Sequence, residues 1–200
     1  MASMWQLQLL VPADRSCYAQ VEAAIRGGVT LVQLREKERS DGETYRVGLE
    51  LRDLVHRAGA AFFVNDRPDL ALALSADGVH VGQDDLPVEV VRRIAPGLLV
   101  GASSHDIESA RRVRAADYVA FGPVFPTPSK EDAAAPTGVE ALRQAAAEIG
   151  RPLVAIGGIG VGKAAQLRAS GIAGVAVISA ILGAADAEAA ARNLRRELGW

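Results

Sequence analysis

The sequence predicts an α/β protein, a single-domain (β/α)8 barrel over residues 1–200, and three observations support this fold class. Short apolar runs alternate with amphipathic segments along the whole chain, without a Pro/Ser-rich linker or a block of charge between them. Eight apolar runs occur, and the last is followed by an amphipathic segment. Several runs are apolar at consecutive positions, which is typical of parallel strands covered on both faces. Eight strand-then-helix units fit a closed barrel.

The expected strands are short runs of apolar residues. Phe62, Phe63 and Val64 follow one another in the third run, and the eighth run is apolar throughout Val175–Ile178. In chain order the runs are Trp5–Val11, Thr30–Leu34, Ala61–Val64, Gly78–Val81, Leu98–Ala102, Tyr118–Phe121, Leu153–Ile156 and Gly174–Ile178.

The segments between the runs carry apolar residues at helical spacing, which predicts helices that turn one face toward the sheet. The spacing is clearest at Val47, Leu51, Leu54, Val55 and Ala58, at Val90, Val91 and Ile94, and at Ala191, Leu194 and Leu198. A flavodoxin-like open sheet of about five strands is the alternative. Eight strands favour the TIM barrel, although 200 residues is short for that architecture.

Composition and charge exclude several classes of protein. Half of the residues are hydrophobic, which is enough for a full core, and 22 Lys and Arg oppose 24 Asp and Glu. The chain therefore lacks the general positive field that binds nucleic acid or anionic membranes, so a phosphate group must be held by local contacts. We expect small-molecule partners, no nucleic acid and no membrane. The sequence does not determine an oligomeric state.

Cysteine content and hydrophobic segments indicate the compartment. Cys17 is the only cysteine, so the chain has no internal disulfide and no cysteine cluster for structural zinc. The first residues lack the basic segment of a secretory signal. The longest uncharged run, Ala169–Ala185, is shorter than the ~20 residues of a membrane span. We expect a soluble, cytoplasmic protein.

Charged residues follow the second strand. Because the carboxyl ends of barrel strands carry the chemistry of such folds, the residues after each strand are the candidates for function. Gln33, Arg35 and Lys37 alternate and so share one side of an extended segment. An ordinary solvated turn is the alternative for so common a string of charges.

Carboxylates follow the third and fourth strands. Asp66 comes after Asn65, and Asp85 after Gln83-Asp84. Each could simply cap the next helix, since Asp66 precedes Pro68 and Asp85 precedes Leu86-Pro87. Carboxylates from neighbouring strand ends beside Arg and Lys are also the arrangement that holds Mg²⁺ on a pyrophosphate.

The fifth strand is followed by Ser103, His105 and Asp106, and the sixth strand is followed by the long connection Gly122–Thr137. Asp106 is expected to cap the next helix, and His105 could be a structural histidine. The long connection carries two hydroxyl residues and a cation, namely Thr127, Ser129 and Lys130. Such a loop is either a lid over an anion or a disordered surface loop.

Glycines follow the seventh strand, at Gly157, Gly158 and Gly160, and Ile178-Ser179 ends the eighth. Adjacent glycines allow backbone N–H groups to approach a ligand, and this corner of a barrel is the usual phosphate site. A tight structural turn is the alternative. With the cationic corner after the second to fourth strands, the sequence predicts two anion sites and hence two phosphorylated substrates.

Six segments together resemble thiamine phosphate synthases in order and spacing, over about Gly27 to Ile181. The segments are Val32–Lys37, Phe63–Arg67, Asp77–Asp85, Gly101–His105, Gly122–Lys130 and Ile156–Ile159. The resemblance implies a (β/α)8 fold and a Mg²⁺-dependent transferase of thiamine biosynthesis. Such an enzyme joins 4-amino-5-hydroxymethyl-2-methylpyrimidine pyrophosphate to 4-methyl-5-(2-hydroxyethyl)thiazole phosphate and releases pyrophosphate.

The resemblance also implies roles for single residues. In that family the pyrimidine pyrophosphate is held by the residues that match Gln33, Arg35, Lys37, Asn65 and Lys130 of this sequence. Those that match Asp66 and Asp85 hold Mg²⁺, and the one that matches Ser103 lies beside the pyrimidine. Thr127 and Ser129 match the thiazole side, and Gly158, Ile178 and Ser179 match the thiazole-phosphate site. The expected catalytic residues are Arg35, Lys37, Ser103 and Lys130.

The sequence departs from that family at two places. Its first loop, Pro12–Ser16, lacks the Asp that is commonly found directly after the first strand. Position 129 is Ser, where Thr is frequent in the family. Two alternative functions remain at this point. One is a thiazole tautomerase that uses His105 as its proton carrier, although that sister family typically lacks the Asp66 and Gln83–Asp85 features. The other is a non-catalytic regulator that binds a phosphorylated metabolite.

Overall fold

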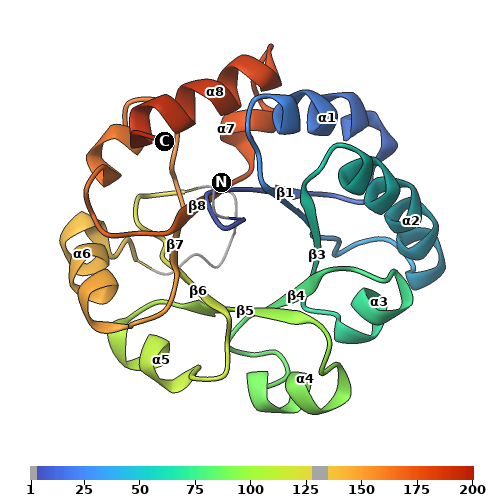
Figure 1. The fold of residues 1–200 in the computed structure, drawn as a ribbon, viewed down its shortest axis with the longest axis horizontal. Helices are drawn as coiled ribbons and strands as arrows, with labels where there is room; N and C mark the ends of the chain where they lie inside the picture. Colours follow the sequence, from blue (N-terminus) through green and yellow to red (C-terminus); the bar gives the residue numbers. More distant parts are fainter. Residues whose placement is uncertain (1–3, 128–134) are drawn as a thin grey trace.

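A computed structural model describes residues 4–127 and 135–200 and has the predicted (β/α)8 architecture. Eight parallel strands form a closed barrel in chain order, with β1 paired to both β2 and β8 (Figure 1). The strands are β1 (Leu7–Val11), β2 (Leu31–Leu34), β3 (Ala61–Asn65), β4 (Gly78–Val81), β5 (Leu99–Ser104), β6 (Tyr118–Phe121), β7 (Leu153–Ile156) and β8 (Gly174–Val177). The prediction of a barrel over an open sheet is confirmed.

Helices surround the barrel and cover the outer face of the strands (Figure 1). They are α1 (Tyr18–Arg26), α2 (Asp41–Arg57), α3 (Pro68–Ala73), α4 (Val88–Ile94), α5 (Ile107–Arg112), α6 (Gly138–Glu148), α7 (Ser179–Leu182) and α8 (Ala187–Leu198). Short 3-10 helices lie at η1 (Arg15–Cys17) and η2 (Ala164–Leu167). Val47, Leu51 and Val55 of α2 are buried, as their spacing predicted.

Two predicted helices differ in the structure. The expected apolar face of α4 included Ile94, but Ile94 is 50% exposed, and the helix buries Val88 and Val91 instead. The connection between β7 and β8 forms only the 3-10 turn η2 rather than an α-helix. Gly162 before this turn and Ala169 after it both have positive φ, which leaves few residues for helix between them.

Aromatic rings fill the inside of the barrel below the carboxyl ends of the strands. Phe63 and Tyr118 are fully buried there, and the Trp5 ring packs on Tyr118 with 4.7 Å between the ring centroids. Gly78 and Gly101 make room for them, since a Cβ at Gly78 would collide with the Phe63 ring and one at Gly101 with Tyr118. The strand glycines are therefore required by packing.

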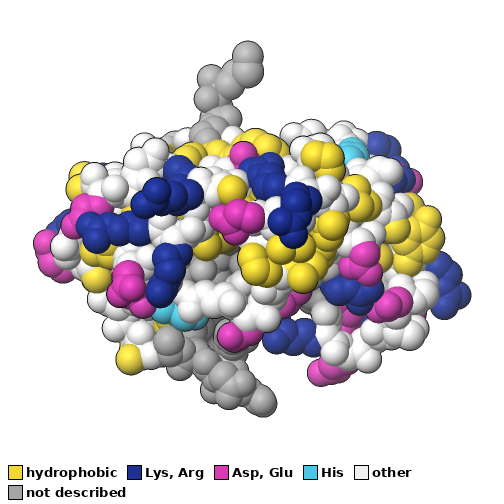
Figure 2. Space-filling model, turned by 90° about the horizontal axis from the view of Figure 1, so that it is seen from below, with side chains coloured by type: hydrophobic (Ala, Val, Ile, Leu, Met, Phe, Trp, Pro, Cys, Tyr) yellow, Lys and Arg dark blue, Asp and Glu magenta, His cyan; other side chains and the backbone are white. Residues whose placement is uncertain are grey.

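The surface carries both signs of charge. On the face shown in Figure 2, Lys and Arg side chains are interspersed with Asp and Glu. Ion pairs among the described residues include Arg15 with Glu50 and Arg67 with Asp41. Within the described part of the chain, no helix is long and apolar enough to cross a membrane.

Candidate functional site

A cavity of about 930 Å³ opens at the carboxyl ends of the strands. Its lining contains every sequence-predicted site residue that the structure describes: Gln33, Arg35, Lys37, Asn65, Asp66, Asp85, Ser103, Thr127, Gly158, Ile178 and Ser179. Two further predicted residues, Ser129 and Lys130, lie outside the described residues. The closed barrel thus brings the polar ends of separate strands around one space.

Asp66 and Asp85 meet at the edge of this cavity. Asp66 has a left-handed backbone conformation, with φ of 65°, and its N–H donates to the His80 carbonyl oxygen at 2.7 Å. Asp85 accepts a hydrogen bond from the Gly82 N–H at 2.7 Å. A non-glycine residue with positive φ is uncommon and costs backbone strain, so the fold holds the Asp66 carboxyl in place against a local preference.

The electrostatics of this pair favour a cation. Burial, the hydrogen bond from Asp85 and the Asp85 charge raise the pKa of Asp66 to about 6, and Arg35 and Lys37 oppose the rise. Two carboxyl groups in contact cannot both ionise without repulsion unless a cation lies between them. Within the described residues, no group of three or more His, Cys, Asp or Glu side chains could hold a metal ion. Mg²⁺ commonly completes its coordination with substrate phosphate oxygens and water.

The capping interpretation of these two residues is wrong. Helix α3 begins at Pro68 with Arg67 at its N-cap, and α4 begins at Val88 with Pro87 at its N-cap. Neither N-cap position makes a side-chain capping hydrogen bond. Asp106 behaves differently and caps α5 as predicted, accepting from the Ser109 N–H at 2.7 Å.

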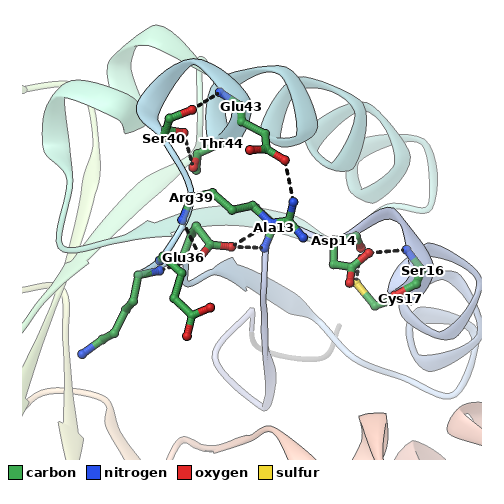
Figure 3. A network of polar contacts seen from close by, with 11 residues as sticks. Ala13, Asp14, Ser16, Cys17, Glu36, Arg39, Ser40, Glu43 and Thr44 are labelled. Atoms are coloured by element: carbon green, nitrogen blue, oxygen red, sulfur yellow. Dashed lines mark hydrogen bonds and ion pairs between the residues drawn. The ribbon is translucent and has the colours of Figure 1, made fainter.

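Glu36 holds the loop that carries Arg35 and Lys37 (Figure 3). Its carboxylate accepts hydrogen bonds from the backbone N–H of Ala13 at 3.0 Å, of Lys37 and Glu38 at 2.8 Å each, and of Arg39 at 3.3 Å. Burial raises the pKa of Glu36, but these hydrogen bonds outweigh it and lower the pKa overall. The loop after β2 is thereby fastened to the loop after β1.

The atypical first loop has a structural role here. Asp14 accepts a hydrogen bond from the Ser16 N–H at 2.8 Å and caps the 3-10 helix η1 (Figure 3). Cys17, which follows, is buried, and burial raises the pKa of its thiol to about 11, so the thiol stays protonated at neutral pH.

A second polar group lies on the floor of the cavity. The two ring nitrogens of the buried His80 contact Tyr118 Oη at 2.8 Å and Ser103 Oγ at 2.9 Å. Burial lowers the pKa of His80 to about 4, which keeps the ring neutral. Burial also raises the pKa of Tyr118, while the nearby Gln33 side chain opposes that rise. These groups connect strands β2, β4, β5 and β6.

Two buried carboxamides end at the cavity with atoms that have no hydrogen-bond partner in the structure. Gln8 is 1% exposed and Gln33 is 2% exposed, and the unpartnered atoms are Gln8 Nε2 and Gln33 Oε1. Three more such atoms, on Gln6, Arg151 and Arg195, lie on residues that do not line the cavity. At Gln8 and Gln33 a water or a bound group in the cavity could supply the missing hydrogen bond. Gln8 was not predicted as a site residue, although it is a polar residue within the apolar run of β1.

The opposite end of the cavity is formed by the connections after β7 and β8. Gly157 and Gly158 have positive φ, and a Cβ at either would collide with the loop after β6, at Pro123 or Pro126. Part of the reason for these glycines is therefore packing. Lys163 also lines this end, with its Nζ 5.4 Å from the centroid of the Phe125 ring, and it was missed from the sequence.

His105 lies at the wall of the same cavity. Its Nδ1 is 2.6 Å from the Gly122 carbonyl oxygen, and since a carbonyl only accepts, Nδ1 carries the proton. In the neutral ring Nε2 is then the acceptor nitrogen.

Comparisons with known proteins agree with this geometry. A family model described as "Thiamine monophosphate synthase" matches residues 7–181. A thiamine-phosphate synthase of Chloroflexus aurantiacus is 49% identical over 197 residues, covering 96% of this chain and 91% of that protein. One of Pyrococcus horikoshii is 42% identical over 196 residues, covering 96% of this chain and 94% of that protein.

Solved structures give the same result. A thiamine phosphate pyrophosphorylase from Pyrococcus furiosus superimposes with a TM-score of 0.88 at 39% identity, covering 98% of this chain and 96% of that chain. A 3-hexulose-6-phosphate synthase from Salmonella typhimurium has a TM-score of 0.75 at 18% identity and shares the fold alone.

Proposed function

The chain belongs to the thiamine monophosphate synthase family and is an enzyme, a transferase of thiamine biosynthesis; from this premise we propose its substrates and the role of each site residue. The proposed reaction joins 4-amino-5-hydroxymethyl-2-methylpyrimidine pyrophosphate to 4-methyl-5-(2-hydroxyethyl)thiazole phosphate. Its products are thiamine phosphate and pyrophosphate. The observation that supports it best is the contact of Asp66 with Asp85 beside Arg35 and Lys37, at one end of a cavity whose other end is glycine-rich.

The carboxyl pair fits a Mg²⁺ ion. Mg²⁺ is usually held by one or two carboxylates together with substrate phosphate oxygens and water, and Asp66 and Asp85 supply two carboxylates and no more. Bound there with the substrate, the ion would neutralise charge on the pyrophosphate. In its absence the two acids compete for one proton, which is the situation that a cation relieves.

The pyrimidine pyrophosphate is assigned to the end of the cavity after β2 and β3. Arg35 and Lys37 bind its phosphate oxygens, with Lys130 as a further cation, and Gln33 and Asn65 contribute hydrogen bonds. An Arg guanidinium grips phosphate oxygens in a bidentate fashion, which fixes their orientation as well as their charge. Glu36 accepts hydrogen bonds from the backbone N–H groups of Lys37, Glu38 and Arg39 and from that of Ala13 in the loop after β1, which holds the backbone that carries these cations.

The chemistry needs charge stabilisation more than a base. The bond between the exocyclic methylene carbon and the pyrophosphate oxygen breaks, and its electron pair leaves with the pyrophosphate. The 4-amino group of the ring donates electrons to the cationic carbon that remains. The thiazole nitrogen then uses its lone pair to form the new C–N bond, and no proton has to be removed. Arg35, Lys37 and Lys130 stabilise the departing charge.

The thiazole phosphate is assigned to the other end of the cavity. Gly158, Ile178 and Ser179 would contact its phosphate, and Thr127 and Ser129 would line the ring. The glycines allow a close approach of the backbone. Ser103 lies between the two ends, beside the pyrimidine.

One assay tests this function. Both substrates are incubated with the enzyme and Mg²⁺, and thiamine phosphate is followed by mass spectrometry with a chelator-treated sample alongside. Formation that depends on both substrates and on the metal supports the proposal. A metal-independent isomerisation of a thiazole would instead identify a tautomerase, and binding without turnover would identify a regulator.

A further inference from the structure

A chain of hydrogen bonds crosses the floor of the cavity, and the proposed function assigns no role to two of its members. Tyr118 Oη lies 2.8 Å from His80 Nδ1, and His80 Nε2 lies 2.9 Å from Ser103 Oγ. The chain therefore runs from Tyr118 through His80 to Ser103.

The direction of these hydrogen bonds follows from the burial of Tyr118. Tyr118 is fully buried, and among the described residues its hydroxyl contacts His80 Nδ1. A buried hydroxyl proton needs an acceptor, so Tyr118 donates its single proton to His80 Nδ1. A neutral histidine that accepts at Nδ1 carries its proton on Nε2. That proton points to Ser103 Oγ.

Ser103 then still has its own proton to donate. Its oxygen accepts from His80, and an acceptor for the hydroxyl proton can bind in the cavity that Ser103 lines. We infer that Tyr118 and His80 are positioning residues that make the Ser103 hydroxyl a hydrogen-bond donor to the substrate. The substrate group that matches is an acceptor such as a ring nitrogen of the pyrimidine, and this part of the inference rests on the proposed function.

Packing holds the chain in one arrangement. Gly101 has no side chain where a Cβ would collide with both the Tyr118 ring and His80 Nδ1. Trp5 packs against the other side of Tyr118, and Phe63 meets it edge-on with 6.2 Å between centroids. The Tyr118 ring is thus fixed by apolar contacts, so Tyr118→Phe removes the hydroxyl while retaining the ring.

The tautomer of His80 tests the inference directly. The chain has three histidines, and ¹⁵N-histidine NMR of the free protein distinguishes protonated from unprotonated ring nitrogens. The His80 signals are assigned from their loss in His80→Gln or, if that variant does not fold, by elimination with His56→Gln and His105→Gln. A proton on Nε2 with Nδ1 unprotonated supports the inference. A proton on Nδ1 alone overturns it, because Ser103 would then donate to His80.

Kinetics test whether Tyr118 acts through Ser103. We expect Tyr118→Phe to lower kcat/KM for the pyrimidine pyrophosphate about tenfold, which is the size of one lost hydrogen bond. In a Ser103→Ala background, Tyr118→Phe should lower kcat/KM by less than about twofold, because the hydroxyl group that Tyr118 orients is then absent. Equal losses in the two backgrounds, or no loss in either, would contradict the inference.

Phe63→Leu is the matched control. It alters the packing around the same ring without touching a hydrogen bond, and its effect should be equal in both backgrounds. The NMR measurement needs no substrate, so it tests the inference even if the assay shows that the enzyme uses other substrates. Inactivity of the wild-type enzyme with both substrates would count against the proposed function alone.

Discussion

The carboxyl groups of Asp66 and Asp85 are hydrogen-bonded to each other, although the two residues follow different strands, β3 and β4. Strands β3 and β4 pair in parallel, with Asn65 opposite His80, and this register places the residues that follow them side by side. Neither aspartate caps a helix. Burial and the contact with Asp85 together raise the pKa of Asp66 to about 6, so the pair holds a proton more readily than an isolated aspartate does.

Neutralising either carboxylate is expected to reduce turnover without unfolding the protein. Asp66→Asn and Asp85→Asn each remove a proposed Mg²⁺ ligand, and we expect a loss of about 10²-fold or more in Mg²⁺-dependent kcat, the size typical for removing one electrostatic contact. The melting temperature should stay the same or rise, because repulsion is relieved. Normal activity in both variants would remove the metal role.

Stability in the absence of metal is expected to depend on pH. The Asp66 carboxyl has a folded pKa of about 6 against an ordinary value of 3.8, so the folded protein binds the extra proton between these values. Its contribution to stability is full below about pH 4 and is lost as the pH rises through about 6. With a chelator present, the melting temperature of the wild type should therefore fall, relative to that of Asp66→Asn, as the pH rises from about 4 to about 6. Adding Mg²⁺ should make this fall smaller. Parallel curves would show that the pKa of Asp66 is not raised in the folded protein.

Replacing Arg35 by Lys is expected to impair use of the pyrimidine pyrophosphate although the net charge is unchanged. A Lys ammonium is a point charge and does not reproduce bidentate contacts with phosphate oxygens. Steady-state kinetics should show a raised KM for the pyrimidine substrate, with the KM for the thiazole phosphate little changed. Arg46→Lys on α2, where the exposed Arg donates a hydrogen bond to the Gly42 carbonyl oxygen, is the control and should behave as wild type. Wild-type kinetics for Arg35→Lys would make Arg35 an ordinary surface charge.

Lys130 and His105 separate the proposed transferase from a tautomerase. A cation that stabilises the leaving pyrophosphate typically contributes about 10² to 10³ in rate, so Lys130→Ala should slow turnover by that factor. His105→Ala should slow it much less, since the proposed chemistry removes no proton. The tautomerase hypothesis gives the reverse order. Single-turnover rates of the two variants decide between them.

The barrel was predictable because its strands are buried on both faces and therefore appear as uninterrupted apolar runs. Three runs, Gly78–Val81, Tyr118–Phe121 and Leu153–Ile156, have the same bounds in the sequence analysis and in the structure. The turn at η2 was not predictable from apolar spacing, since positive φ angles around it stop a helix that the composition permits. Ile94 was assigned to the buried face, but it is the last residue of α4, and the helix buries Val88 and Val91 instead.

The candidate site was predictable where it lies on loops after the strands. Arg35, Asp66 and Asp85 follow apolar runs, and the rule that barrel loops carry chemistry brings them together. Gln8 and Tyr118 lie within strands, and only the closed barrel shows that their side chains reach the cavity. The choice between capping and metal binding also needed the structure, because it depends on where α3 and α4 begin.

Release of pyrophosphate that depends on both substrates and on Mg²⁺ tests the central claim most directly. The wild-type enzyme is incubated with 4-amino-5-hydroxymethyl-2-methylpyrimidine pyrophosphate, 4-methyl-5-(2-hydroxyethyl)thiazole phosphate and Mg²⁺, and pyrophosphate and thiamine phosphate are quantified together. We expect the two products in equal amounts, and a rate that falls to background with chelator or in Asp66→Asn. Thiamine phosphate formed at an undiminished rate without Mg²⁺, or no thiamine phosphate at all, would contradict the account.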